Sequence, residues 1–185
     1  MSRELEFKEG WATVALLLIM LLCVAWSIQA AQWATGLSML QAVVLVGGGL
    51  GILLAKSRIP NVTAHLLSLL SGFTWSAYLT SRVLSNTMGM PIEIAVAEMD
   101  RKLWAWFSAL FSGQTSAGTY MFLLLLGFLL WLLAYFSAWA VFRWQRVWWA
   151  VIVAGVAMMI NVNYAPRNLT GYLIAFVLFA LLLVV

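Results

Sequence analysis

Charged side chains are scarce in this chain. Lys, Arg, Asp and Glu together account for 9% of the 185 residues, whereas 65% of the residues are hydrophobic. A water-soluble domain carries about 25% charged and about 45–50% apolar residues. The composition therefore excludes a water-soluble globular protein and indicates a membrane protein whose length suits one domain of transmembrane helices.

Cysteine is almost absent, and the few charges do not lie where several kinds of chemistry need them. The only cysteine, Cys23, lies within the first apolar run, so the chain can form neither an intrachain disulfide nor a thiolate metal cluster. No acidic residue lies deep within an apolar run, which argues against a proton pump or an ion-coupled transporter. The ten Lys and Arg residues are scattered, and we therefore expect no nucleic-acid partner.

Long apolar runs are what the chain contains instead, and a membrane-spanning helix needs about 20 such residues. We predict an all-α, polytopic transmembrane helix bundle of about six spans, at residues 11–31, 37–55, 62–80, 120–142, 147–162 and 169–185. The first run is too long for a signal-peptide core and should stay in the mature protein. The last run ends without a polar terminus, so we expect residues 1–185 to be the N-terminal part of a longer protein.

Residues 91–111 have a different pattern. Apolar residues recur there in steps of three and four, beginning with Ile92, Val96 and Met99. The positions between them hold charged side chains, namely Glu93, Glu98, Asp100, Arg101 and Lys102. A pair of acids for hydrolysis or metal binding is one interpretation, but a solvated face that neutralises its own charge is favoured. The pattern predicts an amphipathic helix that lies in the membrane interface.

The distribution of Lys and Arg predicts the orientation of the bundle. Six of the ten fall on one side of the predicted spans, namely Arg3, Lys8, Lys56, Arg58, Arg143 and Arg146. The other four fall on the opposite side, namely Arg82, Arg101, Lys102 and Arg167. Because cytoplasmic loops carry an excess of Lys and Arg, this bias predicts a cytoplasmic N-terminus.

Two features inside the predicted spans invite a functional interpretation. His65, the only histidine, could ligate a haem or a chlorophyll-type pigment, although an interhelical hydrogen bond or a headgroup contact is favoured. The glycine-rich run 47–51 lacks the strand and the Lys-Ser or Lys-Thr pair of a phosphate loop. Gly47 and Gly51 instead predict close helix packing. We expect no metal, and no cofactor beyond a bound lipid or pigment.

The stretch from Ala138 to the end of the chain carries a resemblance to a known family, and the part that matches is Arg143 to Asn161. An arginine-rich and aromatic turn, Arg143 to Trp149, is followed by a span that closes on Asn161. This arrangement resembles the membrane-embedded N-terminal region of bacterial multi-pass transglutaminase-like proteins. The resemblance implies a bundle in the bacterial plasma (cell inner) membrane that precedes an extracytoplasmic papain-like domain with a Cys, His and Asp triad. Cys23 and His65 lie in predicted spans, so no catalytic role is assigned to them.

Two functions remain open on this basis. The first is a non-catalytic membrane anchor of a transglutaminase-like protein, which holds an extracytoplasmic domain that is absent from these residues. The second is an accessory or structural subunit of a larger photosynthetic or respiratory membrane complex. In both cases we expect the lipid bilayer and other membrane protein subunits as partners, and no enzyme activity from the residues present.

Overall fold

The computed structural model describes residues 10–112 and 118–185, and these residues form seven α-helices. The helices are α1 Gly10–Ala31, α2 Met39–Lys56, α3 Asn61–Met88, α4 Ile92–Phe111, α5 Thr119–Phe142, α6 Val147–Tyr164 and α7 Thr170–Val184. The all-α prediction is confirmed, and each predicted span and the predicted interfacial segment coincide with a helix.

Four helices, α1, α2, α5 and α6, are long and apolar enough to cross a bilayer. The C-terminal helix α7 is equally apolar but has only 15 residues. Large apolar side chains are exposed over the whole bundle, among them Leu53, Leu129 and Leu181. A water-soluble monomer rarely exposes apolar surface of this extent. The protein is therefore an integral membrane protein with four candidate spans.

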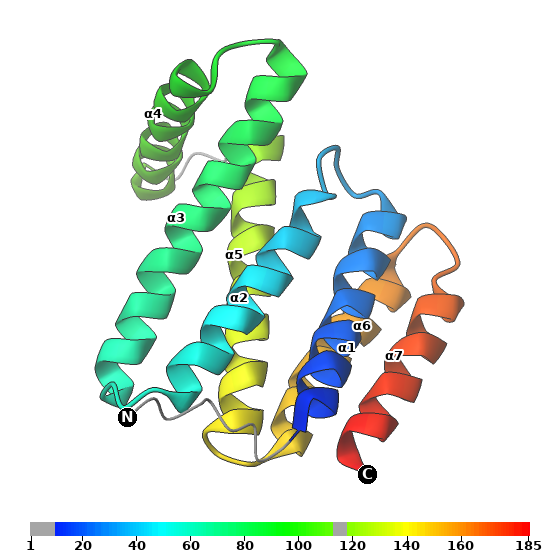
Figure 1. Ribbon diagram of the computed structural model, residues 1–185. Helices are drawn as coiled ribbons and strands as arrows, with labels where there is room; N and C mark the ends of the chain where they lie inside the picture. The colour runs from blue at the N-terminus through cyan, green and yellow to red at the C-terminus, as the bar shows by residue number, and fades with distance from the viewer. Residues whose placement is uncertain (1–9, 113–117) are drawn as a thin grey trace.

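Six of the seven helices, all but α4, form two groups of three and run up and down in alternation (Figure 1). Helices α2, α3 and α5 pack against one another in the first group, and α1, α6 and α7 do so in the second. The groups are joined where α1 packs on α2 and where α5 packs on α6. Helix α1 begins and α7 ends at the same end of the bundle (Figure 1).

Helix α3 is apolar on its outer side and small or polar on its inner side. Its buried residues include Ala64, Ser68, Gly72, Ser76 and Thr80, which recur every four residues. The outer face carries leucines such as the one that is 69% exposed at position 70. Hydroxyl-bearing residues in the inner face lower the hydropathy of α3, which is why it is not among the four candidate spans. This distribution is the reverse of that in a soluble helix.

Helix α3 continues to Met88, eight residues beyond the predicted span. Hydroxyls in this last part donate to backbone carbonyls one turn back, as Thr80 does to Ser76 and Ser81 does to Ala77. The helix ends at Gly89, whose φ of 64° places it in the left-handed region that glycine adopts without strain. The helix therefore ends at a residue that can reverse the chain without strain.

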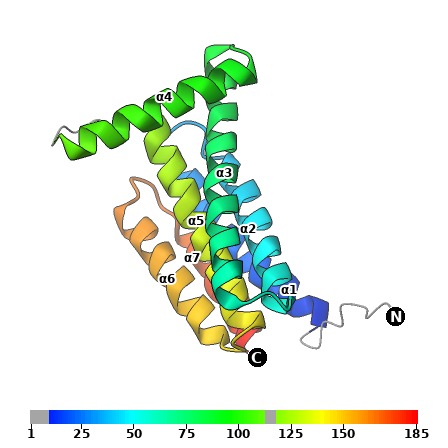
Figure 2. The ribbon, with the colours of Figure 1, turned by 90° about the vertical axis from the view of Figure 1, so that its left-hand side faces the viewer.

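Helix α4 lies crosswise over the end of α3 and α5 instead of running along the bundle (Figure 2). Ala95 and Met99 are buried, and Met99 packs with Met121 and Leu124 of α5. Trp104, on another side of the helix, is 77% exposed. This crosswise placement with one buried apolar face agrees with the predicted amphipathic helix.

Candidate functional site

The centre of the first helix group is Trp131 of α5, which is 1% exposed. A Cβ atom added at Gly72 of α3 would lie 2.3 Å from its ring, and one added at Gly47 of α2 would lie 3.1 Å from it. The indole Nε1 donates to the carbonyl and to the hydroxyl of Ser68, at 3.0 and 3.2 Å. Two glycines on neighbouring helices thus make the slot into which this indole fits.

The prediction that Gly47 and Gly51 mediate close helix packing is confirmed. An added Cβ at Gly51 would lie 2.8 Å from Cβ of Ala138 and 3.1 Å from the backbone of Tyr135. Because real Cβ atoms essentially never approach so closely, α2 and α5 can only meet here with glycine at this position. The glycine run is a packing surface.

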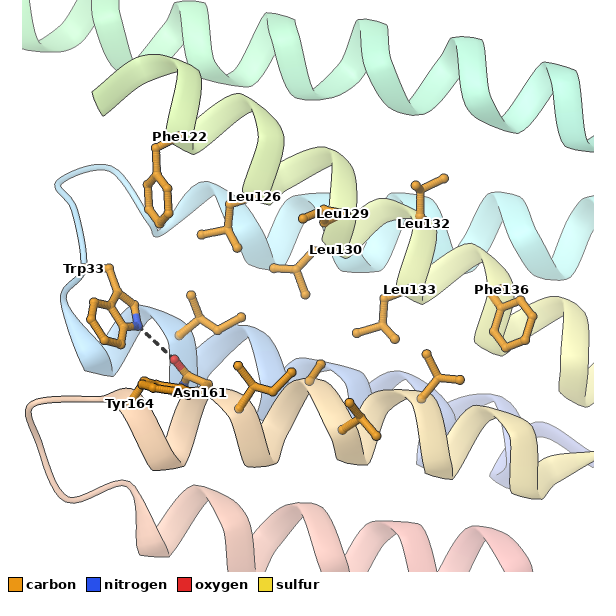
Figure 3. A pocket seen from close by; sticks show the side chains of 15 residues that line it. Trp33, Phe122, Leu126, Leu129, Leu130, Leu132, Leu133, Phe136, Asn161 and Tyr164 are labelled. Carbon is orange, nitrogen blue, oxygen red and sulfur yellow. Dashed lines mark hydrogen bonds between the residues drawn. The ribbon is translucent and has the colours of Figure 1, made fainter. Parts of the chain in front are cut away.

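The other side of α5, which packs on α6, also borders a cleft. This cleft has a volume of about 690 Å³ and lies mainly between α5 and α6 (Figure 3). Leucines of α5 such as Leu126, Leu129 and Leu133 form one wall, and Val153 and Val156 of α6 belong to the other. The volume falls in the range of about 300–1,000 Å³ that is typical of small-molecule sites.

One end of the cleft is polar. Asn161 of α6 is 7% exposed there, and its Oδ1 accepts a hydrogen bond of 2.9 Å from Nε1 of Trp33 in the loop between α1 and α2 (Figure 3). Its Nδ2 donates to the hydroxyl of Ser27 at 3.1 Å, and that hydroxyl donates to the carbonyl of Val24. The phenol of Tyr164 also lines this end. The polar network thus ties α6 to α1 and to the Trp33 loop.

His65 does not line this cleft. It is half-buried on α3, where its Nδ1 lies 2.7 Å from the hydroxyl of Tyr135 on α5. Its ring packs against Trp139 with the ring centroids 4.7 Å apart. This is the interhelical hydrogen bond that the sequence favoured, and the pigment or haem ligand stays a prediction.

Arg143 lies at the same end of the first helix group as His65 and Trp139. Its guanidinium lies 5.4 Å from the ring of Trp139 and donates hydrogen bonds to the carbonyls of Ala55 and Ser57 and to Oδ1 of Asn61. These bonds satisfy carbonyls at the C-terminus of α2 that have no partner within the helix. Arg143 therefore fastens the turn after α5 to the loop between α2 and α3.

Three charged residues of α4 pair with one another, in agreement with the predicted face that neutralises its own charge. Oε1 of Glu98 lies 2.7 Å from Nη2 of Arg101 and 3.2 Å from Nζ of Lys102. The hydrogen bonds from Arg101 and Lys102 lower the pKa of Glu98 from 4.5 to about 2. The carboxylate therefore stays ionised throughout the physiological pH range, which suits a solvated face better than proton transfer.

The fold and these contacts define the class of the protein, an all-α multi-pass integral membrane protein with four candidate spans. No family model matches the chain, and neither a search of curated proteins nor one of solved structures finds a similar protein.

Sequence reasoning missed the cleft and its polar end. The apolar lining residues of α5 and α6 look the same as any other residues of a lipid-exposed helix, so the sequence carries no signal for the cleft itself. A signal did exist for the polar end, because Asn161 is a polar side chain at the end of an apolar run. Such residues are candidates for interhelical hydrogen bonds.

Proposed function

We propose that this protein is a six-span structural bundle that anchors an attached domain or supports a partner subunit in the membrane. In this proposal the bundle has a supporting role, and its interior side chains pack the helices against one another. The observation that carries the proposal is the interlock of Trp131 with Gly47 and Gly72, because it joins three helices at one fixed point. Close-packed interiors have low compressibility, so the helices of such a bundle keep their relative positions under strain.

The inner face of α3 supports a fifth span. Small and hydroxyl-bearing residues such as Ser68 and Ser76 face neighbouring helices, while leucines face outward. Transmembrane interfaces are enriched in such small residues, because they let helix backbones approach closely. Helix α7 supports a sixth span, since it packs on α1 and buries Phe176 and Ala180.

The proposed orientation places the N-terminus in the cytoplasm, in a bacterial plasma membrane. With six spans, the end of the bundle where α1 begins also holds the loops with Lys56, Arg58, Arg143 and Arg146. The basic residues at the opposite end include Arg101 and Lys102, which pair with Glu98. Cytoplasmic loops carry an excess of Lys and Arg, so the four basic residues of these loops support the proposed orientation.

The more specific form of the proposal is an anchor for an extracytoplasmic transglutaminase-like domain. Its support is the resemblance of residues 138–161, and it stays a prediction because no family model matches any part of the chain. The second candidate is an accessory subunit of a larger membrane complex. The surface that it would offer to a neighbouring helix is the outer face of α6, where Ile152 and Met159 are more than half exposed.

Purification of the natively expressed protein in mild detergent tests these proposals. An intact mass well above 20.6 kDa supports the anchor, and a mass near 20.6 kDa with a stoichiometric membrane partner supports the accessory subunit. A mass near 20.6 kDa with no protein partner contradicts both. As a matched pair for the accessory-subunit proposal, Gly72→Ala should weaken co-purification of the membrane partner by disturbing Trp131, whereas Gly49→Ala should leave it unchanged, because no atom lies within 4 Å of a Cβ there.

A further inference from the structure

We propose that the cleft between α5 and α6 holds one acyl chain of a phospholipid, with the lipid phosphate at the end formed by Trp33, Asn161 and Tyr164. This inference goes beyond the structural role proposed above and does not depend on it. It rests on the length of the cleft, on its polar end and on the charge next to that end.

The length of the cleft matches one leaflet of the bilayer. Its wall on α5 extends from Phe122 to Phe136, which is about 21 Å at 1.5 Å per residue. Its wall on α6 extends from Val153 to Tyr164, about 17 Å by the same rise. One leaflet contributes about 15 Å to a hydrocarbon core of about 30 Å. An acyl chain that runs from the membrane surface towards the bilayer centre therefore fits the cleft along its length.

The polarity of the cleft is that of a lipid with its headgroup at one end. Apolar side chains form nearly all of the lining, and Figure 3 shows Trp33, Asn161 and Tyr164 together at a single end. Both polar atoms of the Asn161 side-chain amide, Oδ1 and Nδ2, are hydrogen-bonded, so this end is held in place before a ligand arrives. Tryptophan and tyrosine side chains lie at headgroup level in membrane proteins.

Charge complementarity identifies the headgroup as a phosphate. Arg167 follows Tyr164 by three residues in the loop between α6 and α7 and is exposed. Three residues span at most about 11 Å, so the backbone of Arg167 is close enough to that of Tyr164 for its long side chain to reach a phosphate at the polar end of the cleft. Guanidinium groups bind phosphate oxygens through charge-assisted hydrogen bonds. The proposed occupant is an anionic phospholipid from the surrounding leaflet, because its net negative charge favours a place beside Arg167 more than a zwitterionic headgroup does.

Photo-crosslinking tests the proposal on the full chain in phosphatidylcholine nanodiscs. The probe is a phosphatidylglycerol with a diazirine in the middle of one acyl chain, and labelled residues are mapped by mass spectrometry. Leu129 and Val156, which line the cleft, should be labelled several-fold more than Leu181 on the outer face of α7. Equal labelling at all three positions would indicate ordinary surrounding lipid and overturn the proposal. Labelling of Leu129 and Val156 below that of Leu181 would overturn it in favour of a protein partner that excludes lipid from the cleft.

Variants separate occupation of the cleft from general lipid contact. Val156→Trp should reduce labelling of Leu129 to the level of Leu181, because the indole fills the cleft. Met159→Trp is the matched control, since both side chains are similarly exposed, 55% and 57%, but only Val156 lines the cleft. If Val156→Trp does not fold, labelling of Val156 in Leu129→Trp gives the same test from the opposite wall. Unchanged labelling in the variant that folds would overturn the proposal.

The headgroup has its own test. The same diazirine placed in a phosphatidylcholine should label Leu129 less than the phosphatidylglycerol probe does. Arg167→Gln should remove that difference, because the net negative charge of the headgroup then has no guanidinium partner. An identical preference in the wild type and in Arg167→Gln would overturn the assignment of the phosphate to Arg167.

Discussion

The two sides of α5 show opposite ways of placing one transmembrane helix beside another. Towards α2 and α3, the large side chain of Trp131 meets Gly47 and Gly72, and the three helices interlock. Towards α6, leucines such as Leu129 face valines such as Val156, and a cleft remains. The distance between two helices is set by the side chains at their contact. Glycine opposite tryptophan closes the gap, whereas large residues opposite large residues hold it open.

The largest loss of stability is expected when the indole of Trp131 is removed from the packed side of α5. Trp131→Ala leaves a cavity between α2, α3 and α5, and such changes cost about 3–5 kcal/mol. Thermal unfolding in detergent should show the loss, while Trp148→Ala, at an exposed position on α6, should leave the midpoint nearly unchanged. Similar midpoints for the two variants would contradict the central role of Trp131.

Adding a methyl group in the slot that holds the Trp131 indole should have the next largest effect on stability. In Gly72→Ala the new methyl group would lie 2.3 Å from a ring carbon of Trp131, and overpacking of this kind costs about 1–3 kcal/mol. Gly49→Ala is the control on α2, where the added Cβ meets no atom within 4 Å. The same unfolding measurement should show a lower midpoint only for Gly72→Ala. Equal stability would show that Trp131 moves aside without cost.

Loss of the hydrogen bond between Trp33 and Asn161, at the polar end of the cleft, should have a weaker effect on stability. Asn161→Leu leaves Nε1 of Trp33 without its acceptor, and interhelical hydrogen bonds in membranes contribute about 1 kcal/mol. Asn163→Leu, at an exposed position two residues further along α6, is the control. Hydrogen exchange in the Trp33 loop should increase only in Asn161→Leu. No increase would mean that the loop is held by other contacts.

The smallest effect on stability is expected on the charged face of α4, away from both packing surfaces of α5. Glu98→Gln removes the ion pairs with Arg101 and Lys102. Because these partners lower the pKa of Glu98 from 4.5 to about 2, the stabilisation is present above pH 4.5 and is lost as the pH falls towards 2. Unfolding midpoints of the wild type and the variant should therefore converge over that window. A constant difference between them down to pH 2 would contradict the assigned ion pair.

Much of the fold could be predicted from the sequence, but little of the cleft. Apolar runs predicted the positions of six helices, and steps of three and four predicted α4, because both signals are local. The length of α3 was missed, since nothing marks the end of that helix before Gly89. Gly47 and Gly51 were identified by their spacing, whereas Gly72, which approaches Trp131 more closely than Gly47 does, lies in a less apolar segment and was overlooked.

The sequence by itself determined that this is a helical membrane protein, because scarce charge and long apolar runs leave lipid as its solvent. It also determined which segment lies crosswise, through the charges that α4 places on one face. Only the tertiary structure decided which side chains meet. His65 reaches Tyr135, and Trp33 reaches Asn161, across 70 and 128 residues of sequence. In lipid the hydrophobic effect does not select helix partners, so shape and hydrogen bonding do, and both depend on residues that are distant in the chain.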